Sequence, residues 1–468
     1  MVTLLLGEAL EYAGVTTLHP GGVGALAVAC MALLIVPSRF VPLILLALAV
    51  YLPSVQRIVI MGADFPLLRF AITIGLARLL VGGALSRMSI IWIDIFVIIG
   101  ALTKIVCVPV TQGNPNLVFQ QVGSAIDAVG AYFMMRASIR SLADLRAFST
   151  GALWICAPVT VIFLIEQSTG RNMLSIFGAP AFSQIRMGKI RCQGAFSHSI
   201  LAGCFFVALL PVWIGRLGEG VKGVMIAASG LLIALTIVIC CASSTPVVAM
   251  VFVGCGFAGY LFWRQLRLVW IAGIIVGIAL HFVMAKGVWH LIARIDLVGG
   301  STGYHRYHLI DKAITYFGEW WLMGTAGTRH WGYGLQDVTN QYVLEGVRGG
   351  FLATLALFAS MVFAFRDVGY WLHRLPPRTA DHFLVYSIGA STRLDRRHHR
   401  GDRPQFRHGQ WRLASHRAHR LGRGQHGIPS LSPHRQSDHA LRRVVAHGDG
   451  QHRTLGIRPA RCHQSVRP

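Results

Sequence analysis

FLATLALFASMVFAF, residues 351–365, contains no charged side chain and directly follows the polar stretch DVTNQYVLEGVRGG, residues 337–350. A helix that crosses the hydrocarbon core of a bilayer needs about 20 mainly apolar residues. The apolar run therefore predicts a membrane helix near 349–365, and its Gly349-Gly350 entrance is suited to close helix packing. Acids, an arginine and amides at the mouth of such a helix indicate a functional surface.

The whole chain has the composition of a polytopic membrane protein. Of its 468 residues 54% are hydrophobic and 13% are charged, whereas soluble domains are about a quarter charged. The mean hydropathy is +0.56. We predict an all-α polytopic integral membrane protein with about 11–12 transmembrane helices. The predicted helices lie near 21–37, 40–55, 66–83, 89–110, 120–136, 147–165, 199–215, 222–241, 245–263, 268–285 and 349–365, and a twelfth starts near 381.

Short basic connections predict the orientation of these helices, because Lys and Arg gather in cytoplasmic loops. The connections rich in Lys and Arg are residues 136–146, 216–222, 263–267 and 366–378. Alternation of the spans puts all of them in the cytoplasm. The longer segments 166–198 and 286–348 then fall together on the outer face.

The net charge of +24 is unevenly distributed: the tail, residues 392–468, contributes +13 of it, with 17 Arg, four Asp and no Lys or Glu. Arg, His, Gly, Pro and Ser without Lys are typical of a GC-rich gene translated out of frame, and a frameshift is our first interpretation. A disordered basic tail and a His-rich metal-binding tract are the alternatives. We therefore predict a fold for residues 1–391 alone and no nucleic-acid partner.

The nine cysteines form no C-x-x-C pair and mostly fall in apolar runs. We interpret them as small buried apolar residues. Neither a disulfide framework nor a metal site is predicted from their spacing.

Polar residues return at one predicted boundary of the membrane. The stretches are EQSTGRNMLSIFG (166–178), KIRCQGAFSHSILAG (189–203), CASSTP (241–246), GYHRYHLIDKAITYFGEWWLMGTAG (303–327) and WGYGLQDVTNQYVLEGVRGGF (331–351). Their gathering on one face favours surface chemistry.

A positive cluster in the first outer segment predicts anion binding. Arg171, Arg186, Lys189 and Arg191 follow Glu166 with no further acid. The guanidinium of Arg191 offers a planar fork of donors that suits phosphate oxygens, although it can also snorkel to lipid phosphate.

Arg306 lies in YHRYHLIDKAI, where a short interfacial helix is predicted. Together with Arg191 it could clamp a diphosphate from two sides without a metal ion. The structural alternative is an ion pair of Arg306 with Asp311 or Asp337.

Several groups qualify as the general base that would activate an acceptor hydroxyl. His305, His308 and His330 have side chains that titrate near neutrality. Asp337 and Glu345 are acidic candidates, although Asp337 also fits the start of the following helix.

These segments resemble the bacterial O-antigen ligase and O-antigen or exopolysaccharide polymerase superfamily. The resemblance rests on TGRNMLSIFG, RCQGAFSHSILAG, SSTP, HRYHLIDKAI, WWLMGTAG and DVTNQYVLEGVRGGFLATLALF, between residues 166 and 370. It implies a C-type glycosyltransferase-like helical fold with a large periplasmic loop. It also implies transfer of a glycan from undecaprenyl diphosphate to an acceptor sugar, without a cofactor or metal.

The resemblance carries over two residues by motif match: Arg191 and Arg306 would hold the diphosphate. The catalytic candidates at the acceptor are His330, Asp337 and Glu345, unless the acceptor is activated mainly by its position. Further substrate contacts are expected from Lys189, Arg329, Asn340, Tyr342 and Arg348. The family often has a His before the Asn of an H-N-x-Y-L-like motif, whereas this chain has Thr339. The general base is therefore not carried over.

The leading prediction is a multi-pass enzyme of the bacterial inner membrane that polymerises lipid-linked oligosaccharides in exopolysaccharide or O-antigen biosynthesis. Its expected partners are an acceptor glycan, the bilayer and the polysaccharide export machinery. A ligase that transfers glycan to lipid A-core or protein is one alternative. A transporter or flippase is the other, against which the sequence has no visible inverted repeat or intramembrane relay of ionisable residues.

Overall fold

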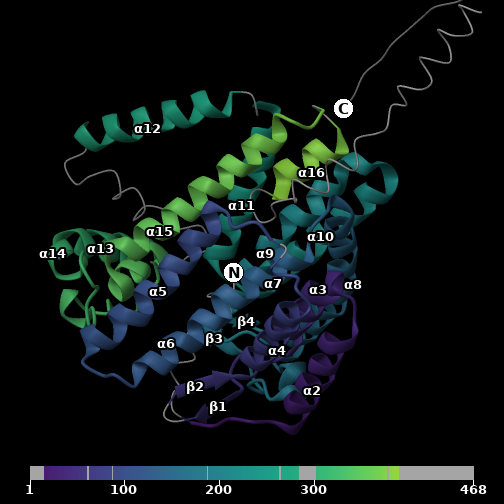
Figure 1. Ribbon diagram of the computed structural model, residues 1–468, viewed down its shortest axis with the longest axis horizontal. Coiled ribbons are helices and arrows are strands. Elements are labelled where there is room, and N and C mark those ends of the chain that lie inside the picture. The colour runs from purple at the N-terminus through teal and green to yellow at the C-terminus, as the bar shows by residue number, and fades with distance from the viewer. Residues whose placement is uncertain are drawn as a thin grey trace, which may run out of the picture. The chain divides into compact units, whose positions relative to one another are not determined.

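The computed structural model describes residues 15–60, 63–86, 88–186, 188–262, 265–283, 302–376 and 379–388. The predicted tail, residues 392–468, and residues 286–301 of the second outer segment lie outside the described residues. The described chain is mostly helical (Figure 1), which agrees with the predicted class. It also contains two short antiparallel hairpins, so the all-α prediction missed a small amount of strand.

Each predicted apolar run contains helix. The helices are α2 (Pro20–Ile35), α3 (Val41–Tyr51), α4 (Leu67–Val81), α5 (Trp92–Gln112), α8 (Leu142–Thr169), α9 (Ser199–Ile214), α10 (Gly220–Cys240), α11 (Ser244–Ala258), α12 (Leu266–Val283), α15 (Gln341–Leu372) and α16 (Ala380–Ile388). The run near 120–136 forms α6 (Leu117–Ala125), the π-helical turn η3 (Ile126–Gly130) and α7 (Ala131–Ser138).

Four of the described helical stretches are long and apolar enough to cross a membrane. They are Trp92–Gln112, Leu142–Thr169, Ser199–Cys240 and Gln341–Leu372. The third of these contains α9 and α10, which pack against each other and are joined by η5 (Gly215–Glu219). The shorter apolar helices are Pro20–Ile35, Ser38–Tyr51, Ser244–Ala258 and Ile271–Val283.

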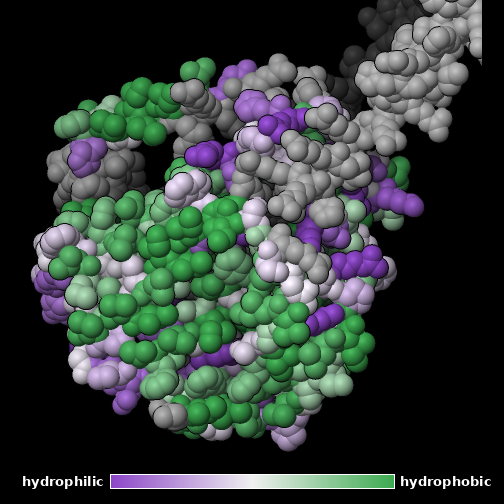
Figure 2. Space-filling model, in the orientation of Figure 1, coloured by the Kyte–Doolittle hydropathy of each residue, from purple (hydrophilic) through white to green (hydrophobic). Residues whose placement is uncertain are grey.

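Large apolar side chains lie on the surface of the helices. Val221 of α10 is 79% exposed, and Phe365 of α15 is 62% exposed. Figure 2 shows hydrophobic residues over much of the face in view. Exposed apolar area on this scale marks an interaction surface, and on membrane-length helices lipid is the fitting environment.

The largest buried cluster is formed by α3, α8, α9 and α10. Phe163, Phe206 and Trp213 are completely buried in it. The Trp213 indole donates a hydrogen bond of 3.1 Å to the carbonyl oxygen of Ser149, as a buried indole N–H requires. This packing fixes the ends of the helices that carry the polar segments.

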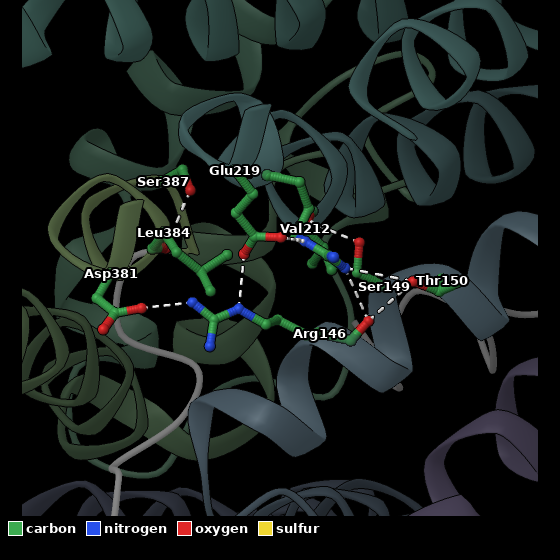
Figure 3. A network of polar contacts seen from close by, with 9 residues as sticks. Arg146, Ser149, Thr150, Val212, Glu219, Asp381, Leu384 and Ser387 are labelled. Atoms are coloured by element: carbon green, nitrogen blue, oxygen red, sulfur yellow. Dashed lines mark hydrogen bonds and ion pairs between the residues drawn. The ribbon is translucent and has the colours of Figure 1, made fainter. Parts of the chain in front are cut away.

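An ion-pair network links three connections at one end of α8, α9 and α10 (Figure 3). Arg146 contacts Glu219 at 2.6 Å and also pairs with Asp381 at the start of α16. Arg216 pairs with the same Glu219 carboxylate. Residues from the predicted basic connections 136–146 and 216–222 therefore meet at one place. Connection 263–267 is only partly described.

Helix α15 is broken at Gly349-Gly350. Gly350 has φ 68° and ψ −172°, so the helix is interrupted between its first turns and its apolar part. A Cβ on Gly350 would lie 2.3 Å from the carbonyl oxygen of Leu322. Across the break, Phe351 N–H donates to Trp321 O at 2.7 Å and Thr325 N–H donates to Val347 O at 2.9 Å. The glycines allow the close packing that the sequence predicted. The break in the helix was not predicted.

Helix α5 runs beside α15 over its length (Figure 1). At one end Trp92 stacks on Phe363, with ring centroids 5.7 Å apart. Farther along α5, Lys104 contacts Glu345 in the first turns of α15 at 3.0 Å. The two helices are therefore antiparallel neighbours.

A buried ion pair joins two of the predicted spans. Arg69 of α4 contacts Asp127 of η3 at 2.6 Å, and their side chains are 6% and 0% exposed. This pair was not predicted, because Arg69 and Asp127 are distant in sequence. Arg69 also donates to Asp64 O at 2.9 Å in β2 (Ala63–Pro66), which pairs with β1 (Arg57–Ile60).

Candidate anion-binding site

Arg191 lies on a hairpin at the end of α8–α10 opposite the ion-pair network. Strands β3 (Gln184–Arg186) and β4 (Lys189–Arg191) pair antiparallel, with Gln184 opposite Arg191. Gly188 in the turn has φ +72°, a conformation that favours glycine. Arg186 and Lys189 are exposed beside the turn. The hairpin thus places three cations close together.

The chain after Arg191 is anchored by Glu166 in the last turn of α8. The Glu166 carboxylate is fully buried and accepts hydrogen bonds from Gln193 N–H at 2.9 Å and Gly194 N–H at 3.1 Å. It also accepts from the Ser183 hydroxyl at 2.7 Å. A buried carboxylate needs such donors. The sequence identified Glu166 only as the last acid before the basic cluster, so its role as an anchor was missed.

The Arg191 side chain is half-buried and lacks a counter-ion in the described part of the chain. Its Nε is buried without a hydrogen-bond partner among the described residues. Burial, and then the nearby Arg186, lower the pKa of Arg191 from its ordinary value. An arginine nevertheless stays charged in a protein. An anion would satisfy both the charge and the orphan donor.

Arg306 lies on α13 (Thr302–Thr315) and donates through Nη2 to the Thr245 hydroxyl at the start of α11. Its hydrogen-bond partner is therefore Thr245. Among the described residues, the structure shows no ion pair of Arg306 with Asp311 or Asp337.

Both arginines lie around the corner between α10 and α11. Arg191 directly precedes Cys192, whose N–H donates to the carbonyl oxygen of Cys240 at the end of α10 at 3.1 Å. Arg306 donates to the hydroxyl of Thr245 at the start of α11. The structure therefore brings the two predicted diphosphate ligands to one corner.

The corner itself favours an anion. Ala242 has φ 45°, a conformation that is uncommon for a residue with a Cβ and that is often found at functional sites. Helix α11 begins immediately afterwards, and the Ser243 side chain forms no capping hydrogen bond within the described residues. The N-terminus of a helix carries partial positive charge and free N–H donors.

Glu345, one of the predicted candidate bases, forms structural contacts within α15 and with α5. It is buried, pairs with Lys104 at 3.0 Å and accepts from the Gln341 amide at 2.8 Å. His330 contacts Glu319 at 2.8 Å, and both side chains are exposed. Desolvation raises the pKa of the Glu319 carboxyl, but the hydrogen bonds from His330 and Trp331 and the charge of His330 together outweigh it and lower this pKa.

Asn340, rather than Asp337, caps α15. The Asn340 side chain accepts from Tyr342 N–H at 2.9 Å and from Val343 N–H at 3.4 Å. The interpretation of Asp337 as the helix start was wrong, because an Asn at the residue before the first turn can reach these donors. Asp337 is exposed, and its carbonyl oxygen contacts His305 Nε2 at 3.4 Å.

The other predicted substrate contacts lie on the surface. Lys189 and Arg329 are exposed, as is Thr339. Tyr342 is 40% exposed and stacks on Phe358 with ring centroids 4.8 Å apart. Arg348 is half-buried one residue before the helix break. Within the residues that the structure describes, no cluster of three His, Cys, Asp or Glu side chains is arranged to hold a metal ion.

Comparison with known proteins adds no relative: no family model, curated protein or solved structure matches the chain. The fold and the site together describe a helical protein with apolar helices of membrane-spanning length. At one end of these helices, Arg191 and Arg306 border the corner between α10 and α11.

Proposed function

We propose that this chain is a glycosyltransferase-like polysaccharide polymerase. It would transfer an oligosaccharide from undecaprenyl diphosphate to an acceptor glycan, at the periplasmic face of the bacterial inner membrane. The observation that carries the proposal is the half-buried Arg191, whose Nε lacks a partner among the described residues, at the corner that Arg306 also borders. The family resemblance of the surrounding segments supports the same chemistry.

The proposed reaction breaks the bond between the anomeric carbon of the donor sugar and the diphosphate oxygen. An acceptor hydroxyl oxygen forms the new glycosidic bond and gives up its proton. Negative charge then develops on the departing diphosphate. Fixed cationic donors that meet this charge lower the barrier without a metal ion, and Arg191 and Arg306 would serve in this way.

On the acceptor side, the candidate general bases differ in whether their side chains are already held by other residues. Glu345 is held by Lys104 and Gln341, and His330 by Glu319. Asp337 has an exposed side chain, and its backbone contacts His305. We therefore favour Asp337, assisted by His305, as the group that accepts the proton of the acceptor hydroxyl.

The finer topology belongs to the same proposal. We propose 11–12 spans in a C-type glycosyltransferase-like arrangement, with residues 166–198 and 286–348 in the periplasm. The meeting of Arg146, Glu219 and Asp381 at the opposite ends of the helices supports a cytoplasmic position for the basic connections.

The test uses the variants Arg191→Ala and Arg306→Ala in the organism that makes the polymer. Each should reduce polymer formation at least about 100-fold, as expected for loss of one preorganised donor to a developing charge. Arg39→Ala is the matched control, because Arg39 stacks on Phe40 at 4.8 Å in the connection between α2 and α3, away from the candidate site.

The accumulated intermediate distinguishes the related functions. A polymerase variant should leave single lipid-linked repeat units, whereas a ligase variant should leave long polymer on the lipid carrier. Normal polymer in both arginine variants, at normal protein levels, would refute the proposal. Failure to present any lipid-linked repeat in the periplasm would instead favour the flippase.

A further inference from the structure

Cysteines that are far apart in sequence come together beside the candidate site. Cys192 directly follows Arg191 on the hairpin, while Cys240 and Cys241 end α10. Their exposed fractions are 0%, 3% and 0%, respectively. The spacing of the cysteines in the sequence predicted no disulfide. Their proximity depends on how the segment after β4 packs against the end of α10, which the sequence does not show.

Cys192 and Cys240 are in direct contact through their backbones. Cys192 N–H donates to the carbonyl oxygen of Cys240 at 3.1 Å, and the Cys192 thiol donates to the side-chain oxygen of Gln167 at 3.2 Å. A backbone contact of this length brings the two Cα atoms to roughly 5–6 Å, within the range of about 4.4–6.8 Å that disulfides need. The geometry of a cross-link is therefore available without moving the backbone far.

We propose that Cys192 and Cys240 form a disulfide under oxidising conditions and thereby tie the hairpin of Arg191 to the end of α10. The two thiols lose two protons and two electrons as the sulfur–sulfur bond forms. A disulfide oxidant of the compartment takes up both and is reduced to two thiols. This inference is independent of the proposed glycan transfer.

Cys241 does not compete for this bond. It is the neighbour of Cys240 in sequence and is equally buried, but it lies toward Gly203 of α9: a Cβ on Gly203 would be 3.5 Å from its sulfur. The backbone contact of Cys192 is with Cys240. Cys241 is therefore the matched control for Cys240.

The reduced pair is shielded from solvent in the folded chain. Cys192 and Cys240 are 0% and 3% exposed, so an oxidant in solution has little access to either sulfur. We therefore expect oxidation of this pair to be slower than modification of the exposed Cys255.

The test counts thiols in the full chain. Membranes are treated with diamide, a small diazene that accepts two electrons and two protons. The protein is then quenched in acid, denatured, and labelled with a maleimide–polyethylene glycol, with and without prior reduction. We expect two fewer labelled thiols without reduction than the nine labelled after it. Cys192→Ser and Cys240→Ser should each abolish this difference.

Cys241→Ser and Cys30→Ser should keep the difference of two thiols. A wild-type protein that labels equally with and without reduction would overturn the inference. So would loss of the difference in Cys241→Ser with its retention in Cys240→Ser, because the bond would then involve the neighbouring sulfur. The readout needs no enzymatic activity, so failure of the proposed function would leave it unaffected.

Discussion

At the scale of single residues, the position of Arg191 depends on a carboxylate that belongs to a different element. Glu166 ends α8, yet it holds Gln193 and Gly194 through their backbone N–H groups. Arg191 could be predicted as an anion ligand from its residue type and its position. Glu166 could not be predicted as its anchor, because hydrogen bonds to backbone groups leave no pattern in the sequence.

Replacing the anchor tests this dependence. Glu166→Gln keeps the size of the side chain but removes its charge, and an amide cannot accept all the hydrogen bonds that the carboxylate accepts. We expect a loss of about 2–4 kcal/mol in the free energy of unfolding, measured by thermal unfolding in detergent. Glu319→Gln, on an exposed side chain, should cost less than about 1 kcal/mol. Equal small effects would mean that Glu166 is not an anchor.

At the scale of the elements, α15 joins the polar stretch to the membrane through its break at Gly349-Gly350. The apolar run predicted the membrane part of this helix, and the glycine pair predicted close packing. The break was not predicted, because it depends on hydrogen bonds to Trp321 and Thr325. The hairpins were missed for a similar reason: strands of three or four residues are too short to show an alternating pattern.

The break can be tested by adding one methyl group. Gly350→Ala puts a Cβ on a residue with φ 68° and 2.3 Å from the Leu322 carbonyl oxygen. We expect a cost of about 1–3 kcal/mol or more in the free energy of unfolding. Gly369→Ala in the same helix meets no atom within 4 Å and should be neutral or stabilise by up to about 1 kcal/mol. A harmless Gly350→Ala would argue against the kink.

The contact of Lys104 with Glu345 ties α5 to α15 and can be measured by a double-mutant cycle. The pair is mostly buried, with side chains 21% and 10% exposed. Lys104→Met, Glu345→Gln and the double variant should give a coupling free energy of about 1–3 kcal/mol in unfolding. Coupling near zero, combined with a large loss of activity in Glu345→Gln alone, would return Glu345 to the list of catalytic bases.

At the scale of the whole helical region, charged groups are sorted to opposite ends of α8, α9 and α10. One end carries Arg146, Arg216 and Glu219, and the other carries the hairpin of Arg191. Helix positions and this sorting could be predicted from apolar runs and charge. The contact of Arg306 with Thr245 and the meeting of the cysteines could not, because they depend on how distant segments pack.

The orientation of this sorting can be tested by labelling introduced cysteines in intact cells. Lys189 is exposed on the hairpin and Lys222 is exposed at the start of α10. A membrane-impermeant maleimide added from outside the inner membrane should label Lys189→Cys and should label Lys222→Cys only after permeabilisation. The wild-type chain gives the background of the native cysteines. The reverse pattern would put the candidate site in the cytoplasm.

The buried pair of Arg69 and Asp127 has a consequence for biogenesis. In the proposed topology both segments cross the membrane, where a lone charge at the centre of a span costs about 2.5–3.5 kcal/mol. Together, with side chains 6% and 0% exposed, Arg69 and Asp127 neutralise each other between α4 and η3. With that topology, the translocation channel would hold the segment with Arg69 until the segment with Asp127 has been synthesised, and release the two into the bilayer as one unit.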